Sequence, residues 1–442
     1  MSFPKDFIWG TATSSYQIEG ARQTRGDSIW DTFSETEGKV KNGDTGDIAC
    51  DHLNRYQADV NMMADLGINA YRFSTAWARI LPEGTGPVNE VGLAFYDQLV
   101  DSLLEKNIAP HITLYHWDLP QALQDQGGWE NPASIDWFCE YSHIVSNALG
   151  DRVKSWITHN EPFVASMIGN LLGVHAPGKQ DPVAAYTVAH HLLISHGLAV
   201  PIIRENSQAS QVGITLNLSY SSPETNRYED RQAARRFAAF NNDWFLEPVF
   251  RGNYPADFLK VVESQGFLKN VTISDIAKAA VPMDFLGINY YTRSIVRDDP
   301  SSPLFDIAFG RDDHAQHTAM DWEVYPDGLL HTLLYVYNAY YPASISITEN
   351  GCAYPDPAPV NGIVEDPLRT DYYRQHIDAV EKAIELGVPV DAYFAWSLMD
   401  NFEWAEGYEK RFGIYYVDFE TQERFPKRSA LYFRDRIQAA QS

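Results

Sequence analysis

Two glutamates in this sequence stand where carboxyl groups can do chemistry. Glu161 follows the apolar run 155–159, and Glu349 follows the run 344–348. A pair of carboxyl groups beside a sugar linkage is what glycoside cleavage needs. One carboxylic acid protonates the leaving oxygen, and the other carboxylate attacks the anomeric carbon or activates water. For each glutamate, the residue types alone leave open a buried ion pair or a supporting role behind another site.

Other polar and aromatic residues follow apolar runs in the same way. Aromatic faces stack on the apolar faces of sugar rings, while amides and carboxylates bind sugar hydroxyls. The residues that end or follow these runs include Arg72, Ser74, His116, Asp118, Asn160, Asn289, Tyr291, Trp396, Glu403 and Trp404. One such group is readily explained as a helix cap, but six runs with the same feature favour a shared site.

Eight short β-rich apolar runs alternate with longer amphipathic segments. The runs lie near 7–12, 70–74, 111–115, 155–159, 211–216, 284–289, 344–348 and 391–396. Many are too apolar to face water on one side, as is typical of parallel strands buried on both faces. Helices are predicted over 54–66, 91–106, 137–149 and 371–386. Glycines that follow them, Gly67, Gly150 and Gly387, are C-cap signals.

Strand–helix alternation of this kind predicts an α/β fold, a single (β/α)8 barrel domain over residues 1–442. The carboxyl ends of the strands of such a barrel converge on one mouth, where active sites lie. The rival is an open doubly wound sheet. That fold usually carries a glycine-rich phosphate loop after an early strand, and this sequence has none.

The motifs resemble those of glycoside hydrolase family 1, the β-glucosidase family. Asn160-Glu161-Pro162 and Ile347-Thr348-Glu349-Asn350-Gly351 resemble its two signature motifs, and the segment 7–20 resembles its N-terminal signature. Further matches lie at 71–74, 115–120, 289–291 and 396–404. The resemblance covers nearly the whole chain, and the motifs occur in order on the expected strands.

The resemblance implies a retaining β-glycosidase that hydrolyses terminal non-reducing β-D-glucosyl residues through a covalent intermediate, with β-galactosidase and β-fucosidase activity as well. Glu161 matches the general acid/base and Glu349 the nucleophile. The residues that match the sugar-binding groups are Gln17, His116, Asn160, Tyr291, Trp396, Glu403 and Trp404. Arg72, Asn289 and Tyr291 match the shell around the nucleophile, Trp322 the aromatic wall for the leaving group, and Asn217 and His175 its entrance.

These roles carry expectations about protonation. Arg72 beside Glu349 is expected to favour the charged form and to lower the pKa of that carboxyl. Glu161 has no obvious cation beside it, so burial and the charge of Glu349 are expected to raise its pKa. Once the glycosyl-enzyme forms, that charge is gone. Glu161 then deprotonates and acts as a base toward water.

Composition limits the partners of the chain. A formal net charge of −25 makes nucleic acid and anionic membranes poor partners. No 18-residue apolar run predicts a membrane helix, and the first residues do not read as a secretory signal. The three cysteines, Cys50, Cys139 and Cys352, are far apart and odd in number, which fits the reducing cytoplasm better than a disulfide framework.

We expect no cofactor and no metal. His190, His191 and His196 would point in different directions on a helix, where successive residues turn by about 100°. The expected partners are β-glucosides and short β-linked oligosaccharides such as cellobiose. The residues do not distinguish glucose from galactose or fucose, nor do they indicate the aglycone or the oligomeric state.

Four alternative functions share parts of this pattern. A 6-phospho-β-glycosidase would carry Ser, Lys and Tyr where this chain has Glu403, Lys410 and Phe412. A thioglycosidase would carry Gln in place of Glu161, and a binding module without activity would lack one of the two glutamates. A transglycosidase shares every residue discussed, so the sequence leaves the balance between water and sugar acceptors open.

Overall fold

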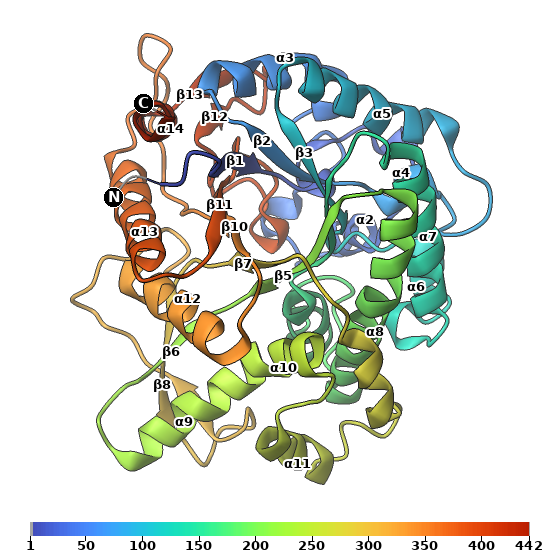
Figure 1. The fold of residues 1–442 in the computed structure, drawn as a ribbon, viewed down its shortest axis with the longest axis vertical. Coiled ribbons are helices and arrows are strands. Elements are labelled where there is room, and N and C mark those ends of the chain that lie inside the picture. The colour runs from blue at the N-terminus through green and yellow to red at the C-terminus, as the bar shows by residue number, and fades with distance from the viewer. Residues whose placement is uncertain (1–2, 442) are drawn as a thin grey trace.

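The computed structural model describes residues 3–441, and at its centre is a closed barrel of eight parallel strands (Figure 1). The strands are β1 (Ile8–Ala12), β2 (Ala70–Ser74), β3 (Ala109–Tyr115), β4 (Ser155–Asn160), β5 (Gln211–Asn217), β7 (Phe285–Asn289), β10 (Ile345–Asn350) and β11 (Val390–Trp396). They follow chain order around the barrel, and β11 closes it against β1. The (β/α)8 prediction is confirmed. Each expected strand is present, while the domain bounds 1 and 442 lie outside the described residues.

The strands are buried on both faces. Every residue of β2, β4, β7 and β10 is buried. One face of each strand packs inside the barrel and the other packs against the surrounding helices, which accounts for the near-continuous apolar runs of the sequence.

Helices surround the barrel (Figure 1). The longer ones are α3 (His52–Leu66), α5 (Glu90–Glu105), α7 (Ser134–Leu149), α8 (Pro182–Asn206), α9 (Tyr228–Ala238), α12 (Pro326–Tyr340), α13 (Pro367–Glu385) and α14 (Arg428–Gln441). The shorter ones are α1 (Ser15–Ile18), α2 (Ile29–Glu35), α4 (Trp77–Ile80), α6 (Gln121–Gln124), α10 (Trp244–Arg251) and α11 (Ala256–Ser264). The four predicted helices correspond to α3, α5, α7 and α13, and the last begins four residues early, at a proline suited to a first turn.

Glycine follows three of the predicted helices for two different structural reasons. Gly67 and Gly387 adopt left-handed backbone with φ of 80° and 90°, as predicted for C-caps. Gly150 is also the C-cap of its helix, α7, but its φ is −69°, so it does not adopt the left-handed conformation. A side chain there would lie 2.4 Å from the carbonyl oxygen of Ser146, so close packing requires this glycine.

One described helix has the length and apolar composition to cross a membrane. This helix is α8, and 89% of its most apolar window is buried inside the fold. Burial to this extent is typical of a core helix. Its three histidines have separate partners, which are the hydroxyls of Tyr254 and Thr158 and the backbone carbonyl of Trp129.

The rim of the barrel contains elements that the sequence did not predict. A three-stranded sheet is formed by β6 (Tyr220–Pro223), β8 (Arg293–Asp298) and β9 (Ile307–Phe309), and a hairpin by β12 (Tyr415–Val417) and β13 (Arg424–Pro426). A π-helix spans Val164–Leu172, directly after the Glu161 motif. These short segments lie on loops at the carboxyl ends of barrel strands, so they shape the mouth.

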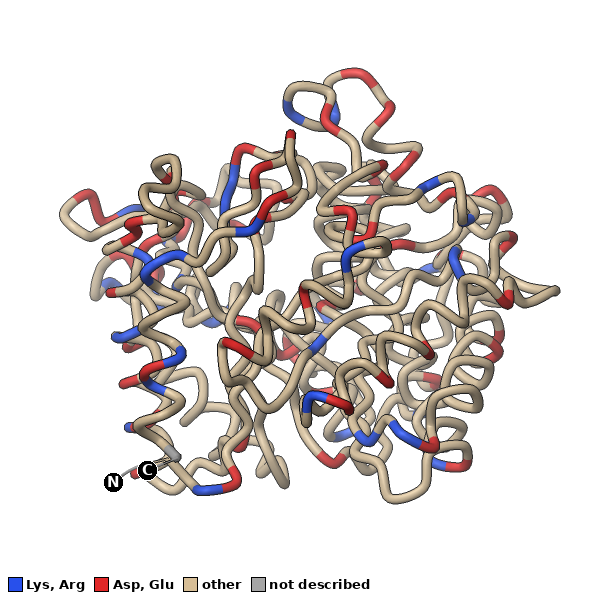
Figure 2. The backbone as a smooth tube through the Cα atoms, turned by 90° about the horizontal axis from the view of Figure 1, so that it is seen from above, with Lys and Arg blue, Asp and Glu red and all other residues tan. Residues whose placement is uncertain are grey.

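Acidic and basic residues are interspersed around the molecule (Figure 2). The net charge of −25 therefore produces a negative electrostatic potential around the whole molecule. Such a field disfavours polyanionic partners as a class. The three cysteines carry free thiols, and Cys50 and Cys352 are buried.

Candidate active site

The carboxyl ends of the barrel strands open into a cavity of about 590 Å³. The structure brings most of the predicted site residues together on its wall. They are His116, Glu161, His175, Asn217, Asn289, Tyr291, Trp322, Glu349, Trp396, Glu403 and Trp404. The other three, Gln17, Arg72 and Asn160, are completely buried directly behind this wall.

Glu349, near the end of β10, is held by two donors. Arg72 from β2 donates to one carboxylate oxygen at 2.5 Å, and the hydroxyl of Tyr291 donates to the other at 2.6 Å. Gly351 lets this strand end approach β11, because a side chain there would lie 1.7 Å from the carbonyl oxygen of Trp396. Each carboxylate oxygen of Glu349 thus has its own hydrogen-bond donor.

Glu161, just after β4, has a different environment. Its carboxyl accepts a hydrogen bond of 2.5 Å from the amide of Asn289, which is fixed in turn by the hydroxyl of Thr348 at 2.7 Å. A neutral amide favours the charged form of a carboxyl far less than an arginine does. Glu161 is therefore the glutamate of this pair suited to hold a proton.

The pKa values of the two carboxyls follow these environments. Burial and the negative charge of Glu349 raise the pKa of Glu161 to about 8, as expected. Burial also raises the pKa of Glu349 above its ordinary value, although Arg72 and Tyr291 act in the opposite direction. The prediction that the pKa of Glu349 is lowered was wrong, because it considered the effect of Arg72 and left out the effect of burial. Glu349 still ionises first, since only this carboxyl has an arginine bonded to it.

We expect Arg72→Met to shift the acidic limb of the pH–rate profile to higher pH. Arg72 lowers the pKa of Glu349, so its removal raises that pKa, and a higher pH is then needed to ionise the nucleophile. The profile of kcat/KM for nitrophenyl β-glucoside measures this shift. Arg79→Met is the matched control, because Arg79 is equally buried in an ion pair with Glu19. An unchanged acidic limb in folded Arg72→Met would contradict the electrostatic role.

His116 presents a free ring nitrogen at the site. Its Nε2 lies 3.0 Å from the amide nitrogen of Asn160, a donor, so the neutral ring carries its proton on Nδ1. Burial and Arg72 hold the pKa of His116 well below its ordinary value, and Nδ1 is buried with no partner among the described residues. An Nδ1–H group without a partner on the cavity wall is suited to donate to a sugar hydroxyl.

Glu403 lies on the cavity wall, beside Gln17. The amide of Gln17 donates to the backbone carbonyl of Phe402 at 2.8 Å and to Glu403 at 3.4 Å. Burial and the charge of Glu349 raise the pKa of Glu403 to about 8. Lys410 does not neutralise this carboxyl, because its ammonium group donates to the carbonyl of Ala319 at 2.7 Å.

Aromatic rings form the remaining walls. The His116 ring is nearly parallel to the rings of Trp396 and Trp404, whose centres lie 5.8 and 6.0 Å away. The Trp322 ring lies 5.3 Å from the Tyr291 ring, centre to centre, and lines the cavity, while its role toward the leaving group stays a prediction. His175 packs 5.7 Å from Trp117, and burial lowers its pKa to about 4, so it stays neutral.

Three cavity residues have left-handed backbone. The φ angles are 49° at Glu161, 75° at Trp117 and 50° at Trp404. Residues with side chains pay an energetic penalty in this region, and such strain is concentrated at functional sites. All three lie within segments that match the family motifs, and all three side chains line the cavity.

The structure also adds wall residues that the sequence did not predict. They are Trp117, Phe163, Val164, Ile168, Leu172, Val174, Leu218, Phe237, Phe240, Asn241, Leu304, Phe309, Met320, Glu406 and Phe412, among others. Trp117 was detectable, because it lies between His116 and Asp118 in a matched motif. Phe237 and Phe309 come from α9 and β9, and their local sequence carries no signal of a site.

Comparison with known proteins agrees with this geometry. The model of glycosyl hydrolase family 1 matches residues 1–442. Beta-glucosidase A of Thermotoga maritima is 48% identical over 98% of this chain and 96% of its own length. The solved structure of the family 1 β-glucosidase from Thermotoga maritima has a TM-score of 0.96 and covers 99% of this chain and 98% of its own. That enzyme has also been solved in complex with deoxynojirimycin.

Proposed function

This chain belongs to glycosyl hydrolase family 1 and is a retaining β-glucosidase, and we propose that Glu161 is its general acid/base and Glu349 its nucleophile. The observation that carries the assignment is the asymmetry of the two environments. Glu349 forms a charged hydrogen bond with Arg72 and ionises first, whereas Glu161 accepts a hydrogen bond from the neutral amide of Asn289 and has a pKa of about 8.

In the first step of the proposed mechanism, the carboxylate of Glu349 attacks the anomeric carbon. The bond between that carbon and the leaving oxygen breaks, and its electron pair stays on the oxygen, which takes the proton of Glu161. Tyr291 fixes the attacking carboxylate through its hydrogen bond of 2.6 Å. The product is a covalent glycosyl-enzyme and a free aglycone.

In the second step, Glu161 works in the opposite direction. The charge of Glu349 has been consumed in the ester bond, so one cause of the raised pKa of Glu161 is gone. Glu161, now a carboxylate, takes a proton from water while the water oxygen attacks the anomeric carbon and releases Glu349. The two inversions together retain the β-configuration.

We expect the first-formed sugar to be the β-anomer. Retention requires the two carboxyls to lie ~5–5.5 Å apart, whereas an inverting enzyme needs ~6.5–9.5 Å for its water molecule. Proton NMR spectra recorded immediately after mixing the enzyme with nitrophenyl β-glucoside measure the anomer before mutarotation. A first-formed α-anomer would rule out the two-step assignment of Glu161 and Glu349.

The 6-phospho-β-glycosidase alternative is not favoured. Its relatives carry Ser at the position of Glu403, and a carboxyl there leaves no compensating charge for a phosphate. Lys410, the cation that such a site would use, is bonded to the carbonyl of Ala319. Two relatives that are 48% and 46% identical to this chain, from Thermotoga maritima and Acetivibrio thermocellus, are named β-glucosidase A.

We propose that apolar aglycones are preferred and that cellobiose and other short β-linked oligosaccharides are also cleaved. The outer wall of the cavity is apolar, and a line of rings leads outward from the catalytic pair. Phe163 contacts Phe240 at 5.3 Å, and Phe237 contacts Phe309 at 5.3 Å. Phe309 is 54% exposed and marks the outer end. Sugar hydroxyls would find few partners along this wall.

We expect kcat/KM to rise from methyl through butyl to octyl β-glucoside. Each buried methylene contributes ~0.8 kcal/mol at most, and binding energy from remote groups adds to kcat/KM. Phe309→Ser should lower the octyl-to-methyl ratio by about threefold or more. Tyr341→Ser, which changes an exposed aromatic residue away from the cavity wall, should leave the ratio unchanged. A flat series in the wild type would contradict the proposal.

A further inference from the structure

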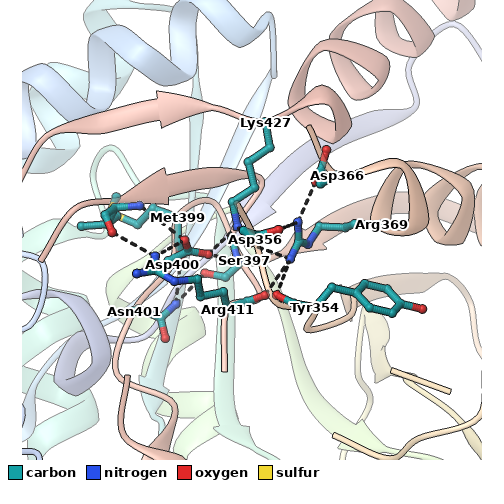
Figure 3. Close-up of polar contacts among 12 residues, drawn as sticks. Tyr354, Asp356, Asp366, Arg369, Ser397, Met399, Asp400, Asn401, Arg411 and Lys427 are labelled. Carbon is teal, nitrogen blue, oxygen red and sulfur yellow. Dashed lines mark hydrogen bonds and ion pairs between the residues drawn. The ribbon is translucent and has the colours of Figure 1, made fainter. Parts of the chain in front are cut away.

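Six charged side chains form a cluster beside the segments that follow β10 and β11 (Figure 3). We call it the ion cluster, and its members are Asp356, Asp366, Arg369, Asp400, Arg411 and Lys427. Most of these side chains are fully buried, and Arg411 is the most exposed. Three carboxylates and three cations balance in charge. Buried charges are tolerated only when they are paired and hydrogen-bonded, as they are here.

Lys427 joins the two halves of the ion cluster. Its ammonium group lies 2.6 Å from a carboxylate oxygen of Asp356 and 2.6 Å from one of Asp400. Asp356 lies on the segment that follows β10, and Asp400 lies on the segment that follows β11. A single buried cation therefore ties together the chain segments that leave two neighbouring barrel strands.

The Asp356 half anchors the segment that follows the nucleophile strand. Arg369 donates to both carboxylate oxygens of Asp356, at 2.9 and 3.1 Å. The same guanidinium donates to the backbone carbonyl of Cys352, three residues after Glu349, at 3.2 Å. This half is therefore fixed relative to the catalytic carboxylate.

The Asp400 half anchors the segment that carries the sugar-binding residues. Asp400 accepts hydrogen bonds from Arg411 at 2.7 Å and from the backbone of Gly413 at 3.0 Å, besides that from Lys427. Its side chain thus points into the ion cluster, whereas Glu403, three residues later, lines the cavity. The short segment between them has one end in the cluster and the other in the sugar site.

A second set of bonds transmits this anchoring to the sugar site. Asn401, next to Asp400, donates to the hydroxyl of Ser397 at 3.0 Å and accepts from the amide of Gln17 at 3.0 Å. The same amide of Gln17 reaches the carbonyl of Phe402 and the carboxyl of Glu403. The chain of contacts from Lys427 to Glu403 is continuous.

We propose that Asp400 is a positioning residue for sugar recognition. Through its ion pair with Lys427, it holds the Glu403 side chain at a fixed position relative to Glu349. The proposal rests on the function proposed above. Asp400 touches no substrate, and its effect is exerted through the 400–403 segment. A role in stability alone is the competing explanation, because the loss of one partner from a buried ion cluster destabilises a fold. The two explanations differ in one expectation: only a positioning role makes the loss of kcat/KM on substitution of Asp400 depend on the presence of Glu403.

The test is a double-mutant cycle with nitrophenyl β-glucoside. Asp400→Asn should lower kcat/KM by roughly 10–100-fold, the scale of a lost hydrogen bond to a charged group, with a raised KM as part of the loss. In the Glu403→Ala background the same change should cost about twofold or less, because its target is gone. Asp59→Asn is the matched control. Asp59 is equally buried and paired with Arg424, so its variant should lose stability but not kcat/KM.

Thermal unfolding of every variant accompanies the kinetics. If Asp400→Asn does not fold, Arg411→Gln is used, because this partner is partly exposed and should give a smaller loss with the same dependence on Glu403. Equal losses in both backgrounds, or a folded Asp400 variant with wild-type kcat/KM, would overturn the proposal. Inactive wild-type enzyme would instead contradict the proposed function, so the two failures are distinguishable.

Discussion

Replacing Glu349 by alanine is expected to lower kcat by roughly 10⁵–10⁶-fold on every β-glucoside, the scale that follows the loss of a covalent nucleophile. Its carboxylate accepts hydrogen bonds from Arg72 and Tyr291, and both donors would lose this acceptor. The loss should not depend on the leaving group, because no glycosyl-enzyme forms in either case. Steady-state rates with nitrophenyl β-glucoside and cellobiose measure it.

Azide provides the decisive control for Glu349→Ala. A small anion that occupies the space of the lost carboxylate would attack the anomeric carbon directly and invert it. The product should be the α-glycosyl azide, which NMR identifies. Glu105→Ala, at an exposed glutamate far along α5, should keep the wild-type rate. A β-azide from the Glu349 variant would show that the two glutamates have been assigned in reverse.

Glu161→Ala is expected to lose roughly 10²–10⁴-fold on substrates with poor leaving groups, the usual contribution of a general acid. With a good leaving group, protonation matters little and hydrolysis of the glycosyl-enzyme becomes limiting. Added azide should then accelerate turnover and give the β-glycosyl azide, because it attacks the covalent intermediate. Comparison of nitrophenyl and methyl β-glucosides separates the two cases.

The pH profile gives the same variant a second readout. The pKa of Glu161 is raised to about 8, so the residue is protonated and active as an acid below that pH and ionised above it. The wild-type profile for a poor leaving group should therefore fall on the basic side in that region. Glu161→Ala should lack this basic limb. A basic limb that persists in the variant would assign it to another group, such as Glu403, whose pKa is also raised to about 8.

The barrel could be predicted because its evidence is local. A strand buried on both faces must be apolar along its length, and a helix that covers it must be amphipathic, so the alternation is written in the order of residues. Polar residues at the ends of these runs then meet at one mouth by topology alone. For this reason Glu161, Glu349 and most of the other predicted residues lie on one cavity wall.

Protonation could be predicted only in part. The raised pKa of Glu161 followed from burial and from the charge of a second carboxylate, both of which the motifs implied. The pKa of Glu349 depended on a balance between Arg72 and the exclusion of water, and the degree of exclusion is a property of the assembled cavity. The free Nδ1 of His116 likewise depends on its contact with Asn160.

The sequence by itself therefore determined the barrel, the position of the two catalytic candidates at strand ends and the chemistry that such carboxyls can perform. Each of these can be predicted from the types of residues and from their spacing over a short stretch of the sequence. The tertiary structure alone decided the apolar outer wall and the ion cluster. Phe163 and Phe309 line one cavity, and Asp356 and Lys427 form an ion pair, although the members of each pair lie many residues apart in the chain. Contacts between such segments cannot be predicted from hydrophobic periodicity or from neighbouring residues, because many different side chains are compatible with the same loop conformation.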